Sequence, residues 1–130
     1  MVHSIPGTSH LFGDKTILIF EDGFLLSEEA QQKLVQWGAH ILGPVTTAER
    51  VLHCLSTAVV DAVILDVMIE PETVLPVIAA LEHLDIPFIF AVSSNPSLDG
   101  QRFAGFILSG FEDDLSTIAT ALFGQRQLVQ

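Results

Sequence analysis

Three carboxylates stand directly after hydrophobic segments of the chain, where acids can do chemistry. Glu21 and Asp22 follow the apolar run Thr16–Phe20, and Asp66 follows the run Ala62–Leu65. Short continuous apolar runs are typical of strands that are buried on both faces of a sheet. The carboxyl ends of such strands form the edge at which open α/β sheets bind ligands. The two segments therefore predict an acidic site, provided that the fold brings their ends together.

Three carboxylates at one edge repel one another unless a cation lies among them or some of them hold protons. Hard oxygen ligands suit Mg²⁺, which keeps several waters and uses few protein groups. A carboxylate beside this ion can attack a phosphoryl group, because the ion neutralises charge on the phosphoryl oxygens. We therefore expect Asp66 to be the nucleophile, with Glu21, Asp22, Asp66 and the backbone carbonyl of Met68 as Mg²⁺ ligands. Any one of these acids alone would be an ordinary loop residue or helix N-cap; the three together favour a site.

The composition excludes several classes of function. The formal net charge is −11, and the five Lys and Arg residues are scattered, whereas phosphate backbones are bound by clustered Lys and Arg. We expect neither nucleic-acid binding nor attraction to anionic membranes. No apolar run approaches the ~18 residues that span a bilayer, and the N-terminus lacks the pattern of a secretory signal. A single cysteine, Cys54, forms no internal disulfide and fits a reducing compartment, so we expect a cytoplasmic protein.

The rest of the chain alternates between strands and helices. Apolar strands are predicted at Thr16–Phe20, His40–Val45, Ala62–Leu65, Phe88–Val92 and Gly105–Leu108. Amphipathic helices are predicted at Phe24–Trp37, from Thr46 or Thr47 to about Ser56, and at Glu70–Leu84, with a short one at Leu98–Arg102 and a last one from Asp113 or Asp114. Five strand–helix units predict an α/β fold of the flavodoxin-like class, a doubly wound parallel sheet with helices on both faces and strand order 2-1-3-4-5. In that order the first and third strands are neighbours, which places Glu21 and Asp22 beside Asp66.

The sequence pattern predicts a single domain. We expect residues 1–14 to be a flexible N-terminal extension, residues 15–124 to form the domain and residues 125–130 to be a polar tail. No glycine-rich phosphate loop follows the first strand, which argues against a nucleotide or flavin site. A phosphatase with an aspartate nucleophile would need a second acid two residues after Asp66, where this chain has Met68.

Four motifs resemble those of response-regulator receiver domains. They are Ile-Leu-Ile-Phe-Glu-Asp at 17–22, Gly-Pro at 43–44, Asp-Ala-Val-Ile-Leu-Asp-Val at 61–67 and Ile-Pro-Phe-Ile-Phe at 86–90. The resemblance extends over about residues 15–123 and implies a CheY-like fold. It implies that Asp66 takes a phosphoryl group from a sensor histidine kinase or a histidine phosphotransfer protein in a two-component phosphorelay, and that Glu21 and Asp22 help to hold Mg²⁺. The protein would then be a phospho-acceptor and not an enzyme, apart from self-catalysed phosphotransfer.

Two family positions that contact the phosphoryl group do not match. A Thr or Ser ends the fourth strand in the family, where this chain has Val92, with Ser93 one residue later. A Lys follows the fifth strand in the family, where this chain has Ser109, and no lysine occurs after Lys33. Arg102 is the nearest cation in the sequence that could compensate. The switch region is therefore atypical.

Two functions follow from this combination. The first is a stand-alone receiver that accepts phosphate on Asp66 with Mg²⁺ and signals unconventionally. The second is a pseudo-receiver that acts as a phosphorylation-independent protein-interaction module. Either would act through a surface, which the resemblance places on the fourth helix, the fifth strand and the last helix, near Phe103, Phe106 and Phe111. Exposed phenylalanines there would indicate a homodimer or a partner site.

Overall fold

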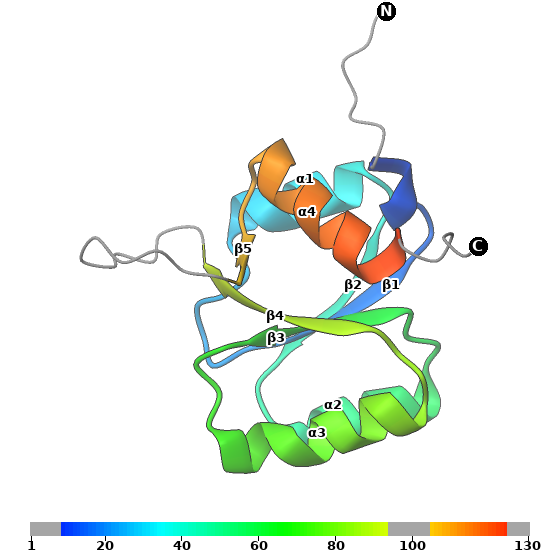
Figure 1. Ribbon diagram of the computed structural model, residues 1–130, viewed down its shortest axis with the longest axis vertical. Coiled ribbons are helices and arrows are strands. Elements are labelled where there is room, and N and C mark those ends of the chain that lie inside the picture. The colour runs from blue at the N-terminus through cyan, green and yellow to red at the C-terminus, as the bar shows by residue number, and fades with distance from the viewer. Residues whose placement is uncertain (1–8, 94–104, 125–130) are drawn as a thin grey trace, which may run out of the picture.

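The computed structural model describes residues 9–93 and 105–124. A parallel five-stranded sheet with the order β2-β1-β3-β4-β5 lies between helices (Figure 1). The strands are β1 (Thr16–Phe20), β2 (His40–Val45), β3 (Ala62–Asp66), β4 (Phe88–Ser93) and β5 (Phe106–Leu108). The helices are η1 (a 3₁₀ helix, Ser9–Phe12), α1 (Glu28–Gln36), α2 (Ala48–Thr57), α3 (Pro71–His83) and α4 (Glu112–Phe123). The predicted doubly wound flavodoxin-like fold and its strand order are confirmed.

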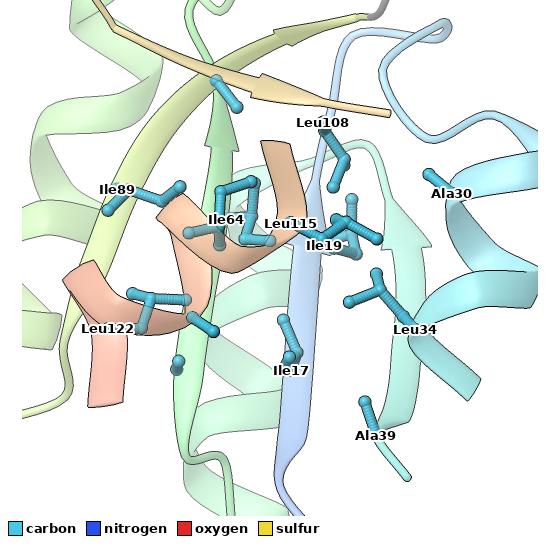
Figure 2. Close-up of a cluster of buried hydrophobic side chains, with 14 of the residues drawn as sticks. Ile17, Ile19, Ala30, Leu34, Ala39, Ile64, Ile89, Leu108, Leu115 and Leu122 are labelled. Atoms are coloured by element: carbon cyan, nitrogen blue, oxygen red, sulfur yellow. The ribbon is translucent and has the colours of Figure 1, made fainter. Parts of the chain in front are cut away.

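Helices cover both faces of the sheet, α1 and α4 on one and α2 and α3 on the other (Figure 1). Because successive residues of a strand point to opposite faces, β1 sends Ile17 and Ile19 to one core and Leu18 to the other. Figure 2 shows the first core, in which Leu34 of α1 and Leu115 of α4 lie over the sheet. All residues of β3 are buried, which explains why its sequence shows no polar alternation.

The first helix begins later than its apolar spacing predicts. We expected a helix from Phe24 to Trp37, but α1 begins at Glu28. Ser27 is the N-cap, and its hydroxyl accepts a hydrogen bond from the backbone N–H of Ala30 at 3.1 Å. A capping serine has extended backbone angles and satisfies a free N–H group of the first turn. Residues 21–27 therefore form a loop at the carboxyl end of β1.

Part of the expected N-terminal extension belongs to the domain. Phe12 is 0% exposed, and its ring lies 5.9 Å from that of Trp37 and 6.1 Å from that of Phe123. The boundary predicted at residue 14 is therefore too late. A single aromatic residue produces no periodic pattern, so the sequence did not reveal this contact. The rest of that extension, residues 1–8, lies outside the described residues, as does the tail 125–130.

The predicted short helix Leu98–Arg102, together with Phe103, also lies outside the described residues. The last helix begins at Glu112, slightly before its predicted start. None of the described helices is long and apolar enough to cross a membrane.

Candidate functional site

Asp66 ends β3, in the middle of the sheet. Its side chain is 5% exposed. Strands β1 and β3 pair in parallel, and Phe20 lies opposite Leu65. The next residues, Glu21 and Asp66, therefore lie at the same edge of the sheet. The strand order thus brings Glu21 and Asp22 to the edge at which Asp66 lies.

Two backbone N–H groups hold the Asp66 carboxylate. The N–H of Asp22 donates to Oδ2 at 3.0 Å, and the N–H of Met68 donates to Oδ1 at 2.9 Å. Hydrogen bonds to a carboxylate are stronger than those between neutral groups. A carboxylate has about four acceptor sites, so each oxygen can still accept another partner. The carboxylate is therefore fixed in orientation and retains free acceptor positions.

The two acids that follow β1 have different surroundings. Glu21 is 6% exposed, and its Oε1 accepts a hydrogen bond from the backbone N–H of Leu26 at 2.9 Å. Asp22 is exposed. Glu21 therefore organises the loop between β1 and α1, while Asp22 is exposed to solvent and contacts Asp66 through its backbone N–H.

The donor chemistry of this edge suits a hard cation. Asp22 and Asp66 offer carboxylate oxygens, and Mg²⁺ needs few protein ligands because it keeps several waters. Within residues 9–93 and 105–124, however, no three His, Cys, Asp or Glu side chains gather as a metal cluster. The predicted ligands Glu21, Asp22 and Asp66 therefore do not gather into a three-acid cage among the described residues, and a Mg²⁺ ion at this edge stays a prediction. Met68 contributes its N–H to Asp66, and the role of its carbonyl stays a prediction.

The end of β4 lies next to Asp66. Ala91 pairs with Asp66, and Val92 and Ser93 follow it. Val92 is half-buried and offers no hydroxyl at the position where the family resemblance leads us to expect one. Ser93 carries the hydroxyl nearest in sequence, at the last residue of the strand.

Ser109 occupies the expected lysine position and is bonded to the start of α4. It is 1% exposed. Its Oγ donates to Oδ2 of Asp114 at 2.8 Å and accepts from the N–H of Phe111 at 3.0 Å. These bonds order the connection between β5 and α4. They leave the Ser109 hydroxyl engaged with the start of α4.

No basic side chain of the described residues forms an ion pair with Glu21, Asp22 or Asp66. Lys15 lies over the ring of Phe123 at 5.0 Å, at the amino end of β1. Lys33 Nζ lies 3.7 Å from Oε2 of Glu112. Arg50 lies in the first turn of α2, which follows the outer strand β2. Arg102 is outside the described residues, so its predicted role stays untested.

Sequence reasoning missed a close approach between α1 and the connection from β5 to α4. A Cβ atom added to Gly110 would lie 2.9 Å from Cβ of Glu29, which is closer than packed carbon atoms approach. Beside this contact is a groove of about 340 Å³ lined by Ser27, Glu29, Ser109, Gly110 and Phe111. A glycine between a strand and a helix can signal a close backbone approach, but the sequence does not identify its partner.

Several solved structures share this fold. SdrG from Sphingomonas melonis Fr1 is 32% identical with a TM-score of 0.62, and the match covers 84% of this chain and 96% of SdrG. The BeF3-activated conformation of SdrG from Pseudomonas melonis Fr1 is 30% identical with a TM-score of 0.61, over 85% of this chain and 97% of the other. A response regulator receiver protein from Sinorhizobium medicae WSM419 shares the fold, with 20% identity, a TM-score of 0.61 and coverage of 88% and 98%. No protein-family model and no curated protein matches the chain.

Proposed function

Because this chain belongs to the response-regulator receiver family, we propose that it accepts a phosphoryl group on Asp66 from a phosphohistidine of a sensor kinase or histidine phosphotransfer protein. The observation that carries this proposal is the buried Asp66 carboxylate, which two backbone N–H groups orient at the edge shared by β1 and β3. One of the similar SdrG structures is a BeF3-activated conformation, which supports the same role for this chain.

In the proposed reaction an oxygen of Asp66 attacks the phosphorus atom of the phosphohistidine. The new bond joins this oxygen to phosphorus, the bond from phosphorus to the imidazole nitrogen breaks, and its electron pair stays on the imidazole. The N–H groups of Asp22 and Met68 keep the carboxylate in one orientation while an oxygen reacts, which lowers the entropic cost of the attack. A Mg²⁺ ion held by Asp22 and Asp66 would neutralise charge on the phosphoryl oxygens.

A second function is favoured by the two positions that depart from the family pattern. Val92 offers no hydroxyl, and the Ser109 hydroxyl is bonded to Asp114. A phosphorylated Asp66 would therefore lack two of the contacts that the resemblance leads us to expect. The alternative function is a pseudo-receiver that binds protein partners without phosphorylation.

Beryllofluoride, which mimics a phosphoryl group on aspartate, separates the two functions. We expect wild-type protein with Mg²⁺ to give a bound fluorine NMR signal and amide shifts around residues 22, 66 and 68. The variant Asp66→Asn should give neither, because the nucleophilic oxygen is lost. Asp85→Asn is the matched control and should behave as wild type, because Asp85 follows α3 at the opposite edge of the sheet.

The wild-type, Asp66→Asn and Asp85→Asn proteins should all give the circular dichroism of the folded state. A folded wild type without a Mg²⁺-dependent signal would exclude phosphate acceptance and leave the pseudo-receiver function. A signal that persists in Asp66→Asn would show that another residue binds the anion.

A further inference from the structure

A groove of about 340 Å³ lies between the start of α1 and the connection from β5 to α4. Ser27 and Glu29 line it from α1, and Ser109, Gly110 and Phe111 line it from the connection. The two walls touch where Gly110 approaches Glu29, so packed elements on both sides hold the shape of the groove. Its volume is at the lower end of the range for small-molecule sites, which is roughly 300–1,000 Å³.

The lining of the groove contains a carboxylate and an aromatic ring. Glu29 is exposed, and its carboxylate forms no ion pair with the described residues. Phe111 is 70% exposed, and the face of an exposed aromatic ring attracts cations. Lys33, one turn further along α1, is engaged with Glu112 at 3.7 Å. The groove therefore offers two groups that attract a cation, and none of its lining residues carries a positive charge.

The charges around the groove favour a cation over an anion. The first turns of α1 and α4 hold the carboxylates of Glu28, Glu29, Glu112, Asp113 and Asp114. The N-terminus of a helix attracts anions through its dipole, but the partial charges of two dipoles are smaller than the charge of these carboxylates. An anionic ligand would therefore be repelled, whereas an ammonium ion is attracted.

The groove lies beside the position at which a positive charge is missing. Ser109 stands where the family resemblance leads us to expect a lysine. Because β5 is two strands away from β3 and neighbouring strands are about 4.8 Å apart, Ser109 lies roughly 10 Å from Asp66. A cation in the groove would therefore attract an anion that is bound to Asp66.

We propose that the groove binds a small primary alkylammonium ion. The ammonium group lies between the Glu29 carboxylate and the Phe111 ring, and the alkyl chain lies over Gly110, which has no side chain. The bound ion supplies positive charge near Asp66 and strengthens the binding of an anion there. The site itself goes beyond the proposed function, and its effect on Asp66 rests on that function.

An amide NMR titration with n-propylammonium chloride tests the site directly. At constant ionic strength, kept with sodium chloride, we expect saturable shifts at residues 27–29 and 109–111. 1-Propanol is the matched control, because it has the same carbon chain without the charge, and it should give no saturable shift there. Equal shifts with 1-propanol would overturn the proposal. Shifts that do not saturate, or that spread equally to the first turns of α2 and α3, would also overturn it, because general charge screening would explain them.

Point variants separate the carboxylate from the ring. Glu29→Gln keeps the contact with Gly110 and should weaken ammonium binding by about fivefold or more, because the hydrogen bond is no longer assisted by charge. Phe111→Leu keeps an apolar wall without the ring and should weaken binding by about threefold. Glu49→Gln is the matched control, because Glu49 is the second residue of α2 as Glu29 is of α1. Equal losses in Glu29→Gln and Glu49→Gln would contradict the proposal.

Beryllofluoride measures the effect on Asp66. Opposite charges roughly 10 Å apart near a protein surface attract each other even in salt, so saturating n-propylammonium should tighten beryllofluoride binding by about twofold at physiological ionic strength and by more at low salt. Coupling between two sites is reciprocal, so beryllofluoride should tighten ammonium binding by the same factor. Unchanged or weaker beryllofluoride binding would reject the coupling between the groove and Asp66.

The site and the proposed function fail separately. Saturable ammonium binding without a beryllofluoride adduct would reject the proposed function and leave the site in place. A beryllofluoride adduct without saturable ammonium binding would reject this inference alone. The circular dichroism of the folded state in every variant excludes misfolding as the cause of either result.

Discussion

Asp66 is positioned by the backbone of its neighbours and not by their side chains. Both of its oxygens accept hydrogen bonds from N–H groups, those of Asp22 and Met68. A side-chain substitution at either neighbour therefore keeps the bond to Asp66 as long as the loop keeps its path. These two hydrogen bonds therefore do not constrain which side chains stand at positions 22 and 68.

At the residue scale, Val92→Thr tests the missing hydroxyl. Valine and threonine have nearly the same shape, and Val92 lies one residue beyond the partner of Asp66 in β4. A new hydrogen bond to the bound anion is worth about 1 kcal/mol, so we expect beryllofluoride to bind about fivefold more tightly in fluorine NMR titrations. Val59→Thr is the control, because Val59 is 80% exposed just before β3, at the opposite edge. Unchanged affinity in Val92→Thr would show that position 92 does not reach the anion.

At the element scale, α1 and α4 are joined through the connection that follows β5. Gly110 approaches Glu29 on α1, and Lys33 of α1 pairs with Glu112 of α4. The ion pair is partly exposed and contributes little on its own. The close approach at Gly110 is the stronger constraint, because a well-packed contact leaves no room for an added methyl group.

Gly110→Ala should therefore destabilise the fold. Its Cβ would meet Glu29 at 2.9 Å, and overpacking of this kind costs about 1–3 kcal/mol. Urea unfolding followed by Trp37 fluorescence measures this cost. The same substitution should cost less in a Glu29→Gly background, since that variant removes the contacting Cβ. Equal costs in the two backgrounds would contradict the steric explanation.

At the scale of the whole molecule, Phe12 packs the residues before β1 against the hydrophobic core. Phe12→Ala removes a fully buried ring that contacts Trp37 of the α1 C-cap and Phe123 of α4. Such substitutions cost about 3–5 kcal/mol, which should lower the urea midpoint of the single unfolding transition. Phe111→Ala is the matched control and should change stability by only about 0.5 kcal/mol, because Phe111 is 70% exposed. A small loss in Phe12→Ala would place residues 9–14 outside the cooperative unit, as the sequence alone suggested.

Acidic residues at the starts of three helices also gather at one edge of the sheet. In a parallel α/β fold each strand leads into the N-terminus of a helix, and acids are favoured in the first turn of a helix by its dipole. The acidic first turns of α1, α3 and α4 therefore collect at the edge that holds Asp66. This arrangement follows from the topology.

The sequence by itself determined the strands, the sheet order and the edge at which Asp66 lies. Continuous apolar runs identify buried strands, and the alternation of strands with helices leaves few topologies. For the second helix the sequence offers Thr46 or Thr47 as the cap, and the structure shows that it is Thr47, whose hydroxyl accepts from the N–H of Arg50 at 3.2 Å. These features are encoded locally, residue by residue, which is why a single sequence suffices to predict them.

Only the tertiary structure decided which groups contact one another. The N–H of Asp22 reaches Asp66 across 44 positions of the chain, Phe12 joins a core whose other members lie far along the sequence, and Gly110 meets Glu29. Backbone N–H groups are present at nearly every residue, so nothing in the sequence marks the two that hold Asp66. Such contacts depend on the path of the loops after the elements pack, and this path is a property of the whole fold.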